Sequence, residues 1–157
     1  MSDANPTDSS LVLRAAREDD DQTLAAFNAA LAQETEDKTL PAERLLAGVR
    51  ALLADPSRGF YVVAERDGEA VGQIMVTTEW SDWRNGFFWW IQSVYVAPEA
   101  RRQGVYSALH REVERRARDE SACGIRLYVE RENTGAQATY RRLGMSPTVY
   151  ELYEVEL

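Results

Sequence analysis

The fold is decided by residues 94–106, which read Val94-Tyr95-Val96-Ala97-Pro98-Glu99-Ala100-Arg101-Arg102-Gln103-Gly104-Val105-Tyr106. An apolar strand is stopped by Pro98, and a turn containing arginine and glycine then leads into a helix. Backbone N–H groups at such a turn point into one concavity, and the helix dipole adds positive potential, which favours a phosphate cradle. It is neither a Walker loop nor a dinucleotide fingerprint, because the Gly-Lys-Ser/Thr and the three spaced glycines are absent. The alternative interpretation is an ordinary strand-to-helix turn with exposed arginines.

The chain before this stretch predicts an antiparallel meander. Apolar runs over residues 60–65, 70–80 and 87–96 are separated by Asp67-Gly68 and Asn85-Gly86, dipeptides that are typical of tight hairpins. The third run is apolar on both faces, which indicates a central strand that is covered on both sides.

Further helices and strands are expected on both sides of the meander. In chain order they are a strand over 11–14, a helix starting at 19–21, a charged loop over 34–38, a helix capped by Thr39 and ended by Asp55-Pro56, a helix over 105–119, a strand over 125–129, a helix over 133–143 ended by Gly144, and a closing strand over 150–157. This order predicts an α/β (α+β) fold. Its mixed, mostly antiparallel sheet contains one parallel strand pair and carries helices on both faces.

Length and composition predict one soluble domain over residues 11–157 after a disordered tail over 1–10. The chain has 157 residues, of which 45% are apolar and 28% charged, and no apolar run is long enough to span a bilayer. Cys123 is the only cysteine and the first residues lack a signal peptide pattern, so we expect a cytoplasmic protein. His110, the only histidine, is expected on the outer side of its helix. One histidine and one cysteine predict no metal site.

Charge is unevenly distributed along the chain. The net charge of −8 argues against binding nucleic acid through a basic surface. Residues 98–142 nevertheless carry a net charge of +3. This basic stretch predicts a local anionic ligand, and the alternative is a solvated helix face with mixed ion pairs.

The turn after Pro98 resembles the signature of the GNAT superfamily of acyl-coenzyme A-dependent N-acetyltransferases, Gln/Arg-x-x-Gly-x-Gly/Ala. Arg101 and Gly104 occupy its first two fixed positions, and Tyr106 stands in place of the final small residue. Residues 133–145 are similar to the family's Asn-x-x-Ala-x-x-x-Tyr-x-x-x-Gly-Phe segment, with Met145 in the Phe position. The element order also matches, so the resemblance covers residues 11–157 and implies that the parallel strand pair is splayed.

The resemblance implies acetyl-CoA as the co-substrate, bound along the splayed end of the central strand like an added strand. It assigns cofactor binding to Val94, Tyr95, Val96, Arg101, Arg102, Gln103, Gly104, Val105, Tyr106, Ser107 and Asn133. Tyr140 matches the family's general acid for the departing thiolate, and its alternative role is a tyrosine on the buried face of the last helix. Glu79 lies where many members place a carboxylate base, and its alternative role is a surface acid at a strand end.

The expected acceptor is a primary amine of a small molecule or peptide. Glu34 and Asp37 fall in a loop that borders the acceptor site in the family and favour a cationic amine, or they belong to a solvated acidic loop. Trp80 and Trp83 either wall an acceptor pocket or form a homodimer contact. The function is therefore acetyl transfer by direct attack in a ternary complex. The alternatives are a non-catalytic acyl-CoA-binding sensor or interaction module and, more distantly, a purely structural partner protein.

Overall fold

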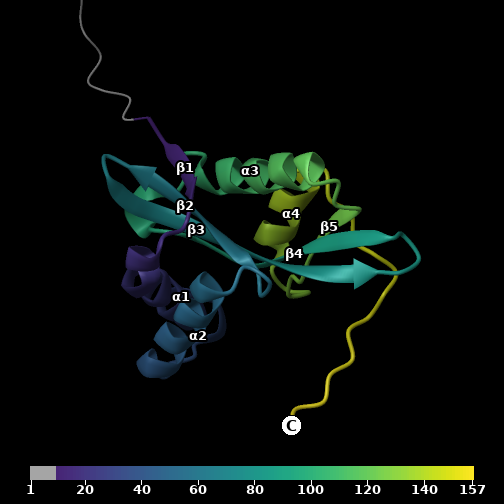
Figure 1. Ribbon diagram of the computed structural model, residues 1–157, viewed down its shortest axis with the longest axis horizontal. Coiled ribbons are helices and arrows are strands. Elements are labelled where there is room, and N and C mark those ends of the chain that lie inside the picture. Colours follow the sequence, from purple (N-terminus) through teal and green to yellow (C-terminus); the bar gives the residue numbers. More distant parts are fainter. Residues whose placement is uncertain (1–9) are drawn as a thin grey trace, which may run out of the picture. The chain divides into compact units, whose positions relative to one another are not determined.

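The computed structural model describes residues 10–157 and divides into two compact units, which meet between Leu127 and Tyr128 (Figure 1). The elements of the first unit are β1 (Val12–Ala15), η1 (Glu18–Asp20), α1 (Asp21–Glu36), α2 (Ala42–Ala54), β2 (Phe60–Arg66), β3 (Glu69–Ser81), β4 (Gly86–Val96), η2 (Pro98–Ala100), α3 (Val105–Asp119) and β5 (Gly124–Leu127). The second unit contains α4 (Thr134–Arg142). None of the helices in the described range is long and apolar enough to cross a membrane.

One mixed sheet organises the first unit, with its five strands in the order β1-β2-β3-β4-β5. The first three pairings are antiparallel and β4 pairs with β5 in parallel, which confirms the predicted fold class. The predicted hairpin at Asp67-Gly68 is present, and both residues have positive φ angles. The second hairpin also forms, but its turn spans residues 82–85, and Gly86 already lies in β4 opposite Ser81. The apolar run of β4 is central because β3 and β5 pair with its two edges.

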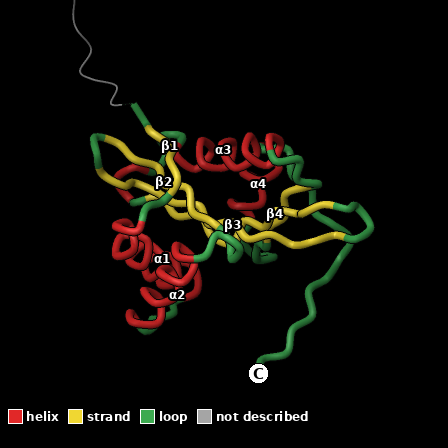
Figure 2. The backbone as a smooth tube through the Cα atoms, in the orientation of Figure 1, coloured by secondary structure: helices red, strands yellow, loops and turns green. Residues whose placement is uncertain are grey.

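Figure 2 shows α3 on one side of the sheet and α1 and α2 on the other. Alternate side chains of the strands build two cores, one against each set of helices. On one face, Ile74, Val76 and Ile91 pack against the apolar stripe of α3, including Leu109. On the other face, Tyr61 and Val63 pack against residues of α1 and α2, including Leu24. The faces are therefore distinct: in the middle of β3, Ile74 and Val76 lie toward α3, and Met75 between them lies toward α1 and α2.

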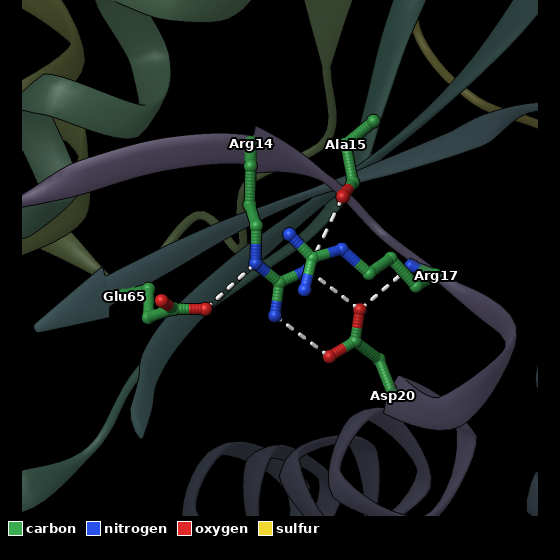
Figure 3. A network of polar contacts seen from close by, with 5 residues as sticks. All are labelled: Arg14, Ala15, Arg17, Asp20 and Glu65. Atoms are coloured by element: carbon green, nitrogen blue, oxygen red, sulfur yellow. Dashed lines mark hydrogen bonds and ion pairs between the residues drawn. The ribbon is translucent and has the colours of Figure 1, made fainter. Parts of the chain in front are cut away.

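A polar network ties β1 to the start of α1 (Figure 3). Arg14 donates from both terminal nitrogens to Asp20, at 2.7 and 2.9 Å, and from Nε to Glu65 of β2 at 2.7 Å. Asp20 also accepts the backbone N–H of Arg17 at 2.6 Å. Hydrogen bonding to Arg14 is the main cause that lowers the pKa of Asp20, and the same interaction is the main cause that raises the pKa of Arg14. Because both side chains are mostly shielded from solvent, this pair fixes how α1 leaves the sheet.

Several boundaries differ from the sequence-based expectations. The charged stretch from Glu34 is helical, because helix-forming residues continue α1 to Glu36 and the left-handed Asp37 ends it. Thr39 does not cap α2, which begins after Pro41. The strand expected over 125–129 ends at Leu127.

Two further expectations are wrong. His110 is 3% exposed, not on the outer side of its helix, because it lies three and seven residues before the buried Val113 and Ala117 on one helical stripe. Residues 150–157 form no strand and are exposed, because apolar alternation alone supplies no neighbouring strand to pair with. Of the tail expected over 1–10, residues 1–9 lie outside the described residues.

Candidate active site

The edge of β4 that faces β5 is paired over only part of its length. Pairing with β5 runs from Phe88↔Gly124 to Ile91↔Leu127, whereas β4 continues to Val96. At the same point the register with β3 shifts, since Met75 lies opposite Ser93 and Val76 lies opposite Ile91. Gln92 is thus an extra residue, a β-bulge that bends the strand. Among the described residues of the first unit, 10–127, no strand pairs with this edge of β4 from Gln92 to Val96, immediately before the Pro98 turn.

Backbone direction alternates along this edge. The N–H of Ala97 donates to Val71 of the β3 side at 2.9 Å, so Ala97 and Tyr95 direct their backbone groups toward β3. The N–H and C=O groups of Val94 and Val96 then point to the open edge. In agreement, the carbonyl of Val96 accepts a hydrogen bond from the Arg101 side chain at 2.9 Å rather than from β3. Of the three predicted strand residues, Val94 and Val96 therefore offer backbone groups to a ligand.

The turn before α3 has the backbone geometry of an anion-binding nest. Arg102 and Gly104 have positive φ angles of 61° and 78°, and Gly104 is the N-cap of α3. The N-cap is a glycine, so it has no side chain with which to cap this helix start. A Cβ placed on Gly104 would meet nothing within 4 Å, which means that the space beside the turn is open. Tyr106, which replaces the small residue of the family signature, packs against the core on the α3 side.

Two side chains of the turn are held by long-range contacts. Besides its bond to Val96, Arg101 pairs with Glu34 of α1 at 2.7 Å, and its guanidinium lies 5.6 Å from the Tyr95 ring centre. Gln103 donates to the Glu99 carbonyl at 2.9 Å and accepts a hydrogen bond from Arg66 at the end of β2. No local sequence pattern predicts this role for Arg66, because it precedes a hairpin dipeptide and lies 37 residues away from Gln103.

Glu79 is held on the sheet face that carries α1 and α2. One of its oxygens accepts the indole N–H of Trp90 at 2.6 Å and lies 3.8 Å from Arg126 of β5. The Arg126 guanidinium also lies 3.5 Å from the centre of the Phe88 ring. Sequence reasoning missed Trp90 and Arg126 as partners of Glu79, because strand register joins three segments that are distant in sequence. The Glu79 side chain is 49% exposed, so solvent reaches it.

The candidate acceptor residues have other partners. Glu34 pairs with Arg101, and Asp37 accepts a hydrogen bond from Gln33 at 2.7 Å. Trp80 stacks edge-to-face on Phe87 with ring centres 4.9 Å apart, and Trp83 in the hairpin turn is 90% exposed. Figure 1 shows that this hairpin extends away from α1 and α2, and these contacts do not join the tryptophans to the acidic residues.

The remaining two site candidates lie in the second unit. Asn133 is the N-cap of α4, and its side-chain oxygen accepts the N–H of Ala136 at 3.1 Å. Tyr140 lies within α4 and is half-buried. The predicted helix is therefore present with a genuine cap, and Gly144 follows it with a φ of 87°, as expected for a residue that ends a helix.

Comparison with known proteins agrees with this geometry. A family model described as "Acetyltransferase (GNAT) family" matches residues 17–145, which include the β4 edge, the turn and α4. The chain belongs to the GNAT acetyltransferase family. The match includes both segments that resemble family motifs, residues 101–106 and 133–145. No curated protein matches the chain significantly.

Solved structures of GNAT acetyltransferases share the fold. The crystal structure of a possible acetyltransferase from Clostridium difficile 630 is 49% identical, with a TM-score of 0.90 over 94% of this chain and 97% of that one. An aminoglycoside N-acetyltransferase, AAC(6')-Iy in complex with CoA, is 19% identical, with a TM-score of 0.76 over 98% and 99% of the two chains. A ribosomal-protein-alanine N-acetyltransferase from Brucella melitensis biovar Abortus 2308 is 17% identical, with a TM-score of 0.77 over 94% and 99%. The latter two show likeness of fold alone.

Proposed function

We propose that this GNAT protein transfers the acetyl group of acetyl-CoA to a primary amine by direct attack in a ternary complex. The observation that carries the proposal is the open edge of β4, which is followed by a helix start whose N-cap is the left-handed Gly104. An extended ligand that ends in a diphosphate fits this arrangement. Its amide-containing arm pairs with a strand edge, and its phosphates meet backbone N–H groups at a helix N-terminus.

The binding roles follow from the direction of each group. Val94 and Val96 hold the pantetheine arm through backbone hydrogen bonds, and Tyr95 supports the edge from the β3 side. The nitrogens of residues 102–107 hold the diphosphate, with Arg101 and Arg102 as the nearby cations and Gly104 leaving room for it. Gln103 keeps the turn in shape through Glu99 and Arg66. The oxygen of Asn133 caps α4, so Asn133 contacts the pantetheine arm through its amide nitrogen.

Acetyl transfer requires a neutral amine at the thioester carbon. Deprotonating a lysine-like amine at pH 7 costs about 4–5 kcal/mol, so a base lowers the barrier. Glu79 is the proposed base. Glu79 accepts a hydrogen bond from Trp90, which precedes Val94 by four residues, roughly 13 Å along an extended strand. Because this distance is too long for direct transfer from an amine beside Val94, the proton reaches Glu79 through water. The solvent exposure of Glu79 supports such a relay.

Two further groups act on the thioester. As the amine nitrogen bonds to the carbonyl carbon, negative charge grows on the carbonyl oxygen, and the N–H of Val94 donates to it from the open edge. When the carbon–sulfur bond breaks, Tyr140 donates its phenolic proton to the departing thiolate. The products are then the N-acetylated amine and free CoA. The nitrogen loses a second proton after it bonds to the carbonyl carbon, and this proton restores the one given by Tyr140, whereas the proton taken by Glu79 is released to solvent.

The acceptor is a small molecule or peptide amine. Glu34 and Asp37 remain candidates for attracting a cationic amine, although Arg101 neutralises part of the field of Glu34. Trp80 and Trp83 are exposed aromatic candidates for acceptor or partner contact. We place the enzyme in the cytoplasm, in keeping with its single free cysteine.

Release of CoA thiol with a panel of polyamines, aminoglycosides, amino acids and peptides tests this function. The proposal predicts turnover with at least one amine. It also predicts that Tyr140→Phe lowers kcat by roughly 10²-fold or more while the Kd for CoA changes less than threefold, since general acid catalysis is typically worth about 10²–10⁴-fold. An unchanged kcat would remove Tyr140 from the mechanism. CoA binding without turnover on any amine would instead favour the non-catalytic acyl-CoA-binding module.

A further inference from the structure

The side chain of Arg101 covers part of the open edge of β4. Its Nε donates to the carbonyl oxygen of Val96 at 2.9 Å. This carbonyl points away from β3, toward the edge with which the pantetheine arm is proposed to pair. A carbonyl oxygen has two lone pairs, but a guanidinium at this distance also fills space that an added strand needs. Arg101 and the pantetheine arm therefore compete for the same part of β4.

A tight turn fixes the backbone of Arg101 beside Val96. The N–H of Ala100 donates to the carbonyl of Ala97 at 2.9 Å, and the N–H of Arg101 donates to the carbonyl of Pro98 at 3.3 Å. Ala100 is 2% exposed and belongs to the core on the α3 side, which anchors the turn. The arginine side chain has several rotatable bonds. The guanidinium can therefore leave Val96 by side-chain rotation, without a movement of the backbone.

Glu34 of α1 holds the guanidinium at the edge. Its Oε2 lies 2.7 Å from Nη2 of Arg101, and the two side chains are 41% and 42% exposed. The Tyr95 ring lies 5.6 Å from the guanidinium and packs on Phe27 of α1, with ring centres 4.9 Å apart. Because an ion pair this exposed contributes little net free energy, a ligand with several negative charges can draw Arg101 away from the single charge of Glu34.

We propose that Arg101 selects the cofactor by the charge of its tail. The phosphates of an acyl-CoA draw the guanidinium away from Glu34 and Val96, and the pantetheine arm then pairs with the freed edge. A thioester without phosphates offers nothing that replaces the contact with Glu34, so the side chain stays on Val96 and the edge remains covered. This inference rests on the cofactor site proposed above, and it gives Arg101 a role beyond that of a cation near the diphosphate.

Binding of CoA and of pantetheine, which lacks the phosphates, to the wild type and to Arg101→Met tests this selection. Methionine keeps a long, flexible side chain but removes the charge and the hydrogen-bond donors. Loss of the competing hydrogen bond should strengthen pantetheine binding about two- to tenfold. CoA binding should not strengthen, because CoA also loses a cation near its phosphates. A side chain that only shaped the turn would leave pantetheine binding unchanged or weaken it.

Two further variants separate charge from competition. Arg102→Met removes one charge from the same turn but leaves the bond between Arg101 and Val96 in place, so it should weaken CoA binding and leave pantetheine binding unchanged. Glu34→Gln loosens the hold on Arg101 and should strengthen pantetheine binding, by less than Arg101→Met does. The amide signal of Val94 in NMR reports binding at the edge, and urea unfolding checks that each variant is folded.

The Nε–H signal of Arg101 reports the position of the side chain itself. Because this N–H donates to Val96, saturating CoA should shift its NMR signal and speed its exchange with solvent. An unchanged Nε–H signal at saturating CoA, or pantetheine binding that does not strengthen in Arg101→Met, would overturn the selection. CoA binding at Val94 in the wild type would in that case still support the cofactor site. A wild type that binds neither ligand would contradict the cofactor site, and this inference with it.

Discussion

The sharpest test of the proposed phosphate site is the substitution Gly104→Asp. Gly104 has a φ of 78°, and a Cβ at this position would meet no atom within 4 Å. Aspartate tolerates left-handed backbone, so we expect a stability loss of only about 1 kcal/mol. The new carboxylate enters the space that the diphosphate requires. Like charges about 5 Å apart repel by roughly 3 kcal/mol at an effective dielectric of 20, and solvent and salt reduce this to about 1–3 kcal/mol. CoA affinity should therefore fall roughly 5- to 150-fold.

The chain supplies a matched control for this substitution. Gly68 in the β2–β3 hairpin has a φ of 81° and also meets nothing within 4 Å. Gly68→Asp therefore imposes the same backbone conformation and charge away from the turn. Titration calorimetry with CoA measures affinity, and urea unfolding measures stability. Equal CoA affinities for Gly104→Asp and Gly68→Asp, at similar stability losses, would refute the assignment of this turn to phosphate binding.

Two further substitutions test the packing of the first unit. Asp20→Asn removes the charge that Arg14 binds in a mostly shielded site and should lower the free energy of unfolding by about 2–3 kcal/mol at pH 7. The folded pKa of Asp20 lies below its ordinary value of 3.8, so the wild type keeps this contribution above pH 3.8 and loses it as the pH falls further. The difference in unfolding free energy between the wild type and Asp20→Asn, measured with urea, should therefore shrink at low pH. A difference that stays constant with pH would contradict the argument. Burial lowers the pKa of His110; the charge of Arg111 adds to this effect and the charge of Glu114 opposes it. The unfolded chain therefore binds a proton at His110 more readily than the folded protein does. The free energy of unfolding should consequently fall as the pH drops below 6.5. In His110→Gln this loss should disappear, and an identical pH profile of the midpoint between pH 7 and 5 would show that His110 is not its source.

The sequence was most informative where local patterns and the family signature coincide. The meander, the turn after Pro98 and the helix that follows are each encoded by neighbouring residues, namely hairpin dipeptides, a proline stop and a helical stripe. The paired state of Glu34 was not predictable, because its partner Arg101 lies 67 residues away. The same holds for Glu79, whose contacts with Trp90 and Arg126 depend on the register of three strands.

Burial and pairing of single residues were the weakest expectations. His110 is expected on the outer side of its helix, yet the buried stripe of α3 is wide enough to include it. Residues 150–157 have strand composition, but a strand forms only when another strand lies beside it, and composition does not say which edge that is. Long-range packing therefore overrode local preference in both places.

Amide hydrogen exchange, followed by NMR with and without acetyl-CoA, tests the central claim most directly. If the cofactor adds to the open edge of β4 and its diphosphate occupies the helix start, exchange should slow at Val94, Val96 and residues 102–107. The N–H of Tyr95 faces β3 and should change far less. Unchanged exchange at Val94 and Val96 under saturating cofactor, or equal slowing at Tyr95, would contradict the account.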